Sequence, residues 1–174
     1  SGSILNADST QNGGFADSVS VGNLGVNADI KGKGGSDTIT VGVIGSGAII
    51  EGNAGGDLLT VTGSFESARI QAGAGNDTIS IESFTNSGVV VGGGGADSIT
   101  VSGNNYAGLS VALGAGSDTL TYQTGGVGTF GEVEVSSLSD STVSAIDTVN
   151  VSGAAGAVGE LTFDVGSSTL AGSA

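Results

Sequence analysis

Cysteine, histidine, methionine, tryptophan and proline are all absent from the 174 residues of this chain. Without cysteine or histidine, and with no serine beside a credible base, the chain lacks the usual nucleophiles and proton carriers of covalent catalysis. We therefore expect no enzymatic activity. The lack of cysteine does not reveal the compartment, because it suits both the cytosol and cysteine-poor exported proteins.

Positive charge is also scarce, with 3 lysines and arginines against 17 acidic residues and a net charge of −14. Such a chain repels phosphate backbones and anionic lipids, so we expect no nucleic-acid partner. No apolar run approaches membrane-spanning length, which argues against membrane insertion. The first ten residues lack the features of a signal peptide, as in a mature or excised piece. Cations are the natural partners.

Glycine, by contrast, is abundant, with 35 residues, and it recurs in a fixed pattern. Regularly spaced Ile, Val and Leu, with a mean hydropathy of +0.28, argue against disorder. Glycine-rich segments precede six aspartates whose residue numbers rise by 20 each time, and by 21 at the last: Asp17, Asp37, Asp57, Asp77, Asp97 and Asp118. A fixed period near 20 is typical of a solenoid whose units bury their apolar faces only by stacking.

Within each repeat the apolar residues alternate with period two, which indicates strands. The second and fourth residues after each aspartate are apolar: Val19/Val21, Ile39/Val41, Leu59/Val61, Ile79/Ile81, Ile99/Val101 and Leu120/Tyr122. A second inward row stands seven residues before the aspartate: Ile30, Ile50, Ile70, Val90 and Val111. The loop between the strands carries a third row: Leu24, Ile44, Phe65, Phe84 and Tyr106. We predict an all-β parallel β-roll or β-helix.

The spacing changes after Tyr122, because the interval from Asp118 to Asp147 is 29 and no glycine turn precedes Asp147. We interpret residues 1–122 as the regular solenoid with six glycine-aspartate turns. Residues 123–174 are then divergent C-terminal coils, a cap and a tail of the same domain. The segment "GELTFDV" is expected to form the last strand.

Stacked coils place one aspartate per coil in line, about 5 Å apart, where each neighbouring pair costs on the order of 1 kcal/mol even in water. Glycines let the preceding backbone turn tightly and bring its carbonyls into a concave ring. A hard cation that takes six to eight carboxylate and carbonyl oxygens would relieve the repulsion, and this describes calcium.

The segments "GKGGSD", "GNAGGD", "AGAGND", "GGGGAD" and "LGAGSD" resemble the G-G-x-G-x-D-x-U-x repeat of the RTX family, whose parallel β-roll binds calcium. Such repeats are found in S-layer and other secreted surface proteins. The resemblance covers roughly residues 12–122. This chain has one motif per repeat, whereas the family has two per turn, so calcium is expected on one side only.

The resemblance implies about five Ca²⁺ ions between consecutive coils, because six turns leave five gaps. The implied ligands are the six aspartates and the carbonyls of the residues that precede them. The glycines among these are Gly32, Gly34, Gly52, Gly55, Gly73, Gly75, Gly92, Gly94, Gly114 and Gly116.

We therefore expect a calcium-stabilised structural module of an extracellular assembly, such as an S-layer, fibre or virion appendage subunit. Its partners would be calcium and other copies of itself or neighbouring surface proteins, at a cell or virion surface. One alternative is a spacer or secretion module of a larger RTX exoprotein. Another is ice or glycan binding by outward Ser/Thr ranks such as Thr38 and Thr40, although Leu58 interrupts one rank and threonine suits any exposed strand.

Overall fold

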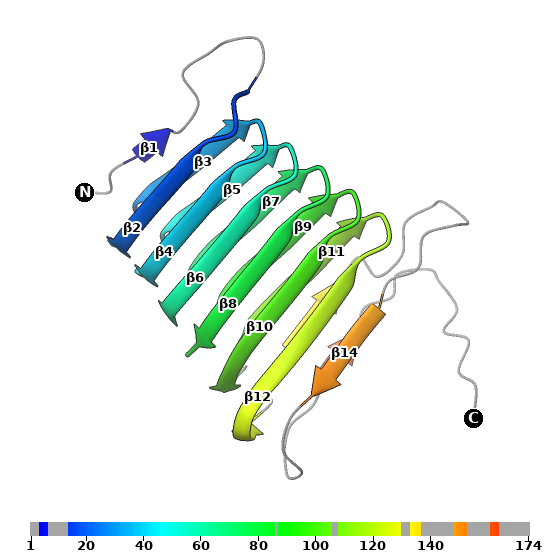
Figure 1. Ribbon diagram of the computed structural model, residues 1–174. Coiled ribbons are helices and arrows are strands. Elements are labelled where there is room, and N and C mark those ends of the chain that lie inside the picture. The colour runs from blue at the N-terminus through cyan, green and yellow to red at the C-terminus, as the bar shows by residue number, and fades with distance from the viewer. Residues whose placement is uncertain are drawn as a thin grey trace.

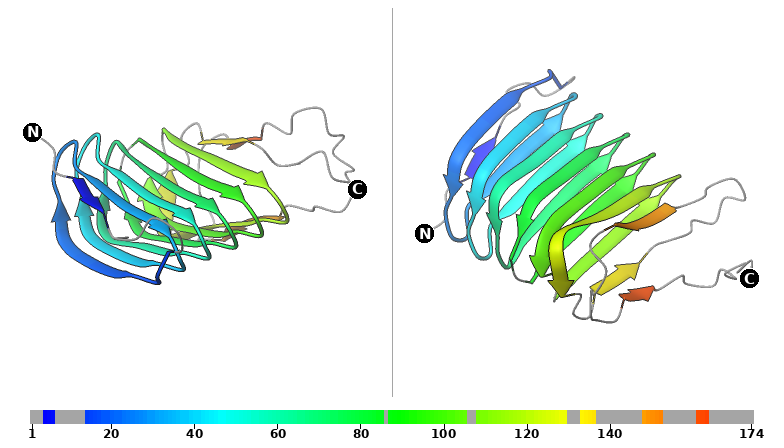
Figure 2. Two further views of the ribbon diagram at one scale, coloured as in Figure 1. Left: turned by 90° about the horizontal axis from the view of Figure 1, so that it is seen from above. Right: turned by 60° about the horizontal axis from the view of Figure 1, so that its bottom comes forward.

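The computed structural model is a parallel β-solenoid, which confirms the predicted fold class (Figure 1). The structure describes residues 4–6, 14–85, 87–105, 108–129, 133–136, 148–152 and 161–163. Two parallel sheets face each other, and the chain passes from one to the other at every turn (Figure 2). No helix occurs among the described residues, and none of them forms a helical membrane span.

Strands with odd numbers form the first sheet, called sheet A. Its order is β1 (Ile4–Asn6), β3 (Asp29–Gly34), β5 (Ile49–Ala54), β7 (Ala68–Ala74), β9 (Gly88–Gly94), β11 (Leu109–Ala115), β13 (Val133–Ser136) and β15 (Leu161–Phe163). Strands with even numbers form sheet B. They are β2 (Ser18–Leu24), β4 (Thr38–Ile44), β6 (Leu58–Phe65), β8 (Thr78–Phe84), β10 (Ser98–Asn105), β12 (Thr119–Thr129) and β14 (Thr148–Ser152).

The register between neighbouring strands follows the repeat of the sequence. Thr38 pairs with Leu58, and Leu58 with Thr78, so paired positions differ by one full repeat. Between β10 and β12 the pairing takes up the longer last interval, since Ser98 pairs with Thr119. Equivalent positions of successive coils therefore lie in line along the stack.

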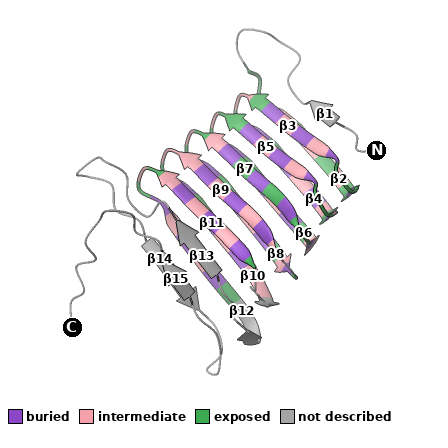
Figure 3. Ribbon diagram, turned by 180° about the vertical axis from the view of Figure 1, so that it is seen from behind, coloured by how far each residue is buried: buried purple, intermediate pink, exposed green. Residues whose placement is uncertain are grey.

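The apolar core lies between the two sheets, where the alternating bands of buried residues meet (Figure 3). All three predicted inward rows are buried wherever the structure describes their side chains, except that Val19 and Val21 in the first coil are half-buried. Tyr106 lies outside the described residues. β-Branched side chains dominate these rows and suit a pleated sheet.

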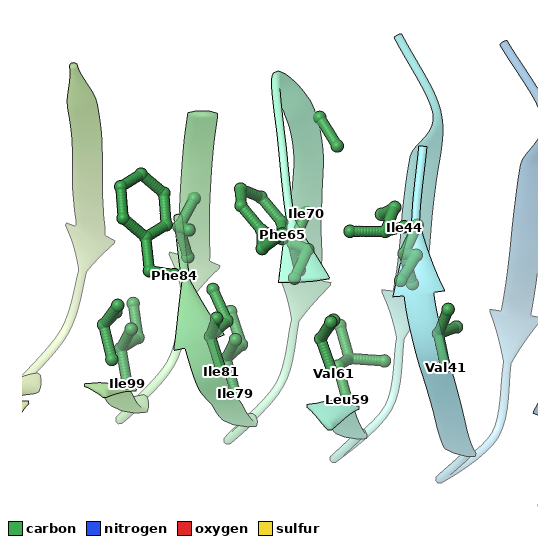
Figure 4. Packing of buried hydrophobic residues seen from close by; sticks show 14 of the residues in the cluster. Val41, Ile44, Leu59, Val61, Phe65, Ile70, Ile79, Ile81, Phe84 and Ile99 are labelled. Atoms are coloured by element: carbon green, nitrogen blue, oxygen red, sulfur yellow. The ribbon is translucent and has the colours of Figure 1, made fainter. Parts of the chain in front are cut away.

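The third row lies at the C-terminal ends of the sheet B strands, where Figure 4 shows Ile44, Phe65 and Phe84 in neighbouring coils. Phe65 and Phe84 pack at a centroid distance of 5.7 Å with their rings tilted by 31°. A register shift in β6 sets this contact, because Phe65 pairs with both Ile44 and Phe84, one position more than a repeat from the first and one position less from the second. The interval from Ile44 to Phe65 is thus one residue longer than the repeat, and the interval from Phe65 to Phe84 is one residue shorter.

The divergent C-terminal segment adds strands to the same two sheets. β13 pairs with β11, β14 pairs with β12, and β15 pairs with β13, all in parallel. β15 falls within "GELTFDV", where the sequence predicts the last strand. Asp147 lies outside the described residues.

The outer faces of the two sheets differ in chemistry. On sheet B the hydroxyl ranks align as the sequence predicts, because Thr40 pairs with both Ser20 and Thr60. The outer face of sheet A carries the ion pair of Lys31 and Glu51, whose hydrogen bond raises the pKa of Lys31. The hydroxyl ranks of sheet B carry no charge.

Candidate functional site

The glycine-rich turns lead from each strand of sheet A into the next strand of sheet B, along the upper side of the stack in Figure 1. Their aspartates turn inward and are buried. Asp37, Asp57, Asp77, Asp97 and Asp118 are between 1% and 3% exposed. An aspartate is rarely buried so completely without a partner, so its contacts decide what the turn does.

One carboxylate oxygen of each aspartate extends the ladder of the sheet. The backbone N–H of Asp57 donates to Oδ1 of Asp77 at 2.7 Å, and that of Asp77 donates to Oδ1 of Asp97 at 2.9 Å. The same bond joins Asp17 to Asp37, Asp37 to Asp57 and Asp97 to Asp118. Each of these carboxylates thus accepts the backbone N–H of the aspartate in the preceding coil, at the turn between the two sheets.

The second carboxylate oxygen is the anomaly of the site. Oδ2 is buried in Asp17, Asp57, Asp77 and Asp97, and it accepts no hydrogen bond from any described residue. A buried carboxylate oxygen without a donor is unfavourable, because it has lost its hydrogen bonds to water and gained none in the protein. A bound cation or a proton would remove this penalty.

Burial raises the pKa values of the three central aspartates. Burial raises the pKa of Asp57 to about 6, opposed by the hydrogen bond from Asp37 and reinforced by the charges of Asp77 and Asp37. Burial likewise raises the pKa of Asp97 to about 6, and the charges of Asp118 and Asp77 add to the effect. The pKa of Asp77 is raised by burial as well. The charged forms of these aspartates are therefore disfavoured when no cation or proton compensates them.

The residue five positions before the aspartate faces this second oxygen. A Cβ on Gly52 would lie 2.3 Å from Oδ2 of Asp57 and 2.5 Å from the carbonyl oxygen of Ala72 in the next coil. Gly32 and Gly92 have the same surroundings. In these three coils the absence of a Cβ leaves room for the aspartate carboxylate and for the carbonyl oxygen of the next coil. Ala72 and Leu113 occupy the equivalent places in their coils and are fully buried.

Carbonyls four and two residues before the aspartate point forward along the stack. The oxygen of Asn53 lies 2.0 Å from the ideal Cβ position of Gly73, and that of Gly55 lies 1.9 Å from that of Gly75. Gly73 and Gly75 have φ of 122° and 132°, which favours glycine. Gly114 and Gly116 repeat this arrangement against Gly93 and Gly95.

Carbonyls three residues before the aspartate point backward along the stack. The oxygen of Ala74 accepts the N–H of Gly55 at 2.8 Å, and that of Gly94 accepts the N–H of Gly75 at 2.7 Å. The oxygen of Gly34 also points back to the first coil, where it lies 1.6 Å from the ideal Cβ position of Gly14. Each gap between turns therefore receives oxygens from both of its coils.

The gap between the turns of Asp57 and Asp77 illustrates the donor set. The coil of Asp57 directs two carbonyls and its second carboxylate oxygen to the gap, and the coil of Asp77 directs two carbonyls and Oδ1: Asn53 O, Gly55 O, Asp57 Oδ2, Ala72 O, Ala74 O and Asp77 Oδ1. A carbonyl oxygen that accepts one hydrogen bond keeps a second lone pair for a cation. Hard, oxygen-only donors are the kind that calcium prefers.

The gaps do not form a conventional cluster of acidic ligands. Among the described residues, no group of three or more Asp, Glu, His or Cys side chains is close enough to hold a metal ion. An ion in a gap would depend mainly on backbone oxygens. The structure brings the predicted aspartates and glycines to the gaps, and calcium binding there stays a prediction.

Side chains directly before the aspartate are contacts that the sequence did not single out. Oγ of Ser36 accepts the N–H of Gly56 at 3.2 Å, and Oδ1 of Asn76 accepts the N–H of Ala96 at 2.8 Å. Both bonds cross from one coil to the next. The only sequence signal is that Ser and Asn alternate with Gly and Ala at this position.

Comparison with protein-family models, curated proteins and solved structures gives no match to this chain. The RTX resemblance therefore rests on the repeated motif of the sequence alone.

Proposed function

We propose that this chain is a calcium-stabilised structural module of an extracellular surface assembly. One observation carries the proposal: the buried Oδ2 atoms of Asp57, Asp77 and Asp97 accept no hydrogen bond from any described residue, and neighbouring turns direct backbone oxygens into the gaps between them. A stack of buried carboxylates needs a compensating charge, and the few lysines and arginines cannot supply it.

Calcium would act here as a structural ion. When bound, it would neutralise the aspartate ladder and tie each turn to the next, since the ligands meet only when coils are stacked. Each ion would cancel two of the surplus negative charges of the chain. Ion binding and folding are then linked, so that calcium stabilises the chain by mass action.

Equilibrium dialysis with ⁴⁵Ca²⁺, combined with thermal melting, tests this proposal. We expect about five bound ions per chain, one for each gap between six turns, with weaker binding in the first gap, whose turn "NGGFAD" is degenerate. Chelator should lower the melting temperature and calcium should restore it. Fewer than about three ions, or a melting temperature indifferent to both, would contradict it.

An exported spacer module would share this calcium chemistry and would differ only in that its copies remain dispersed.

Ice or glycan binding is the second candidate function, because hydroxyls align in register across sheet B and these ranks are uncharged. Leu58, 42% exposed, breaks one rank, so we expect no thermal hysteresis. A freezing-point depression that disappears in a Thr40→Tyr/Thr100→Tyr variant that still folds would favour this candidate instead.

A further inference from the structure

As far as the structure describes the chain, the two ends of the solenoid end in the same kind of strand edge. In sheet A the outermost strands are β1 and β15, and in sheet B they are β2 and β14. Each pairs on one side only with another described strand. An edge strand carries a row of N–H and C=O groups that can pair with another chain.

Hydrogen bonds fix which groups of β2 face outward. The N–H of Thr38 donates to the C=O of Asp17 at 2.8 Å, so Asp17 directs its carbonyl to β4. Neighbouring residues of a strand in a parallel ladder direct their backbone groups to opposite sides. Ser18 and Ser20 therefore direct their N–H and C=O groups away from β4, to the side called the open side, where β2 pairs with no described strand.

The first coil also exposes apolar surface at this end. Phe15 is 65% exposed and Val26 is 61% exposed, the two highest values among the large apolar residues that the structure describes. Val19 and Val21 are half-buried, whereas Ile39 and Val41, one coil further, are fully buried. Burial of such surface by a further coil is favourable.

The chain already contains the interface that would cover this end. Every coil packs on the next through parallel pairing of both sheets, and the register continues through β14, where Thr148 pairs with Thr119 and Val149 with Leu120. Thr148 and Val149 thus occupy the same register positions as Ser18 and Val19. In a head-to-tail stack, β14 of one copy would meet β2 of the next, and β15 would meet β1.

We propose that a second copy of this chain stacks head to tail on the first, β14 and β15 of one copy pairing in parallel with β2 and β1 of the other. The contact is heterologous and translates along the stack, so it produces an open filament. This inference rests on the proposed function in that it names the partner of the assembly. It uses the strand edges, not the ion sites.

Engineered disulfides test the predicted register, because the native chain has no cysteine. In the stack, Ser18 lies opposite Thr148 across one strand spacing of about 4.8 Å, within the Cα separation that a disulfide tolerates. We expect oxidised Ser18→Cys/Thr148→Cys protein to form a series of covalent dimers, trimers and longer chains. Each single-cysteine variant can give dimers at most. The mismatched pair Ser18→Cys/Asn150→Cys should give at least tenfold less oligomer.

A backbone variant tests whether the edge of β2 makes the contact. Ser20→Pro removes an N–H that faces the open side and leaves the ladder to β4 intact, while Ser20→Ala keeps that N–H. In sedimentation velocity and electron microscopy with calcium, we expect filaments for the parent and Ser20→Ala and monomers for Ser20→Pro. Circular dichroism of Ser20→Pro checks its fold, and the disulfide pair tests the same contact without relying on this variant.

The outcomes separate this inference from the proposed function. A chain that binds calcium in dialysis but forms no covalent series overturns head-to-tail stacking alone. Equal yields from the matched and mismatched cysteine pairs overturn it too. A covalent series from a chain that binds no calcium supports stacking and overturns the calcium proposal.

Discussion

A single aspartate of the ladder has two separable tasks, and two substitutions at Asp77 distinguish them. Asp77→Asn keeps an Oδ1 acceptor for the N–H of Asp57 and removes the charge. Asp77→Ala removes both, and the buried N–H left without an acceptor costs about 1–3 kcal/mol. In chelator we therefore expect Asp77→Asn to match or exceed the parent in melting temperature and Asp77→Ala to melt below Asp77→Asn.

In calcium both variants should lose most of the stabilisation contributed by the two gaps that Asp77 borders. Dialysis should find up to two fewer ions per chain in both. If Asp77→Asn binds as many ions as the parent and responds equally to calcium, the carboxylate is not a ligand.

The raised pKa values of the central aspartates predict how the calcium-free chain responds to pH. Asp57 and Asp97 have pKa values of about 6 in the folded chain, against 3.8 for an ordinary aspartate. The folded chain then binds more protons than the unfolded chain between these values, so stability rises as pH falls from about 7 to 4.

Urea denaturation in chelator at several pH values measures this slope. With saturating calcium the slope should reverse over the same range, since protons compete with the ion for carboxylates. A calcium-free chain that loses stability steadily from pH 7 to pH 4 would contradict the assignment.

The backbone conformation at Gly75, two residues before Asp77, requires glycine. In Gly75→Ala the new Cβ would lie 1.9 Å from the carbonyl oxygen of Gly55, at a φ of 132°. We expect a loss of about 3 kcal/mol or more in the free energy of unfolding. Gly94→Ala is the matched control, because its Cβ meets no atom within 4 Å. Equal denaturation curves for the two variants would refute this account.

At the scale of the element, the end of β6 and the start of β9 are fitted to each other. A Cβ on Gly88 would lie 2.1 Å from an edge carbon of the Phe65 ring. Gly88→Ala should therefore destabilise the parent chain strongly. In a chain that already carries Phe65→Leu, the same substitution should destabilise only weakly, which gives a coupling energy of about 0.5–3 kcal/mol between the two positions. A double-mutant cycle by urea denaturation measures it, and additive effects would show that the ring does not fill this space.

Much of the architecture could be predicted because two periods are visible at once. The constant spacing of the aspartates predicts stacked coils, and the alternation after each aspartate predicts which residues, such as Ile39 and Val41, face inward. The register shift near Phe65 cancels within two coils, so that it leaves the spacing of the aspartates unchanged.

The internal geometry of the turns could not be predicted in this way. A polar, glycine-rich segment is ordinarily exposed, whereas Asp57 is buried and bonded to the backbone of Asp37. That contact joins equivalent residues of neighbouring repeats and has no signature beyond the repeat itself. The bonds made by Ser36 and Asn76 are hidden for the same reason.

At the scale of the whole molecule, each coil is held by its two neighbours, which predicts a gradient of local stability. Strands β6 and β8 lie in the middle of sheet B, whereas β2 pairs on one side only with a described strand. In the unassembled chain, amide hydrogen exchange should be slower in β6 and β8 than in β2, since the ends of a stack open without disturbing its middle. Uniform protection along the chain would mean that the solenoid unfolds as one cooperative unit.

The constant register of β4, β6 and β8 has a genetic consequence. A deletion of residues 58–77 would join Asp57 directly to Thr78 and leave the reading frame, the turn and all three inward rows intact, because it removes one whole period. Duplication of the same segment would add a coil in the same way. The gene can therefore lengthen or shorten its product by recombination between its own repeats, and the number of coils can vary between lineages faster than the residues that build each coil.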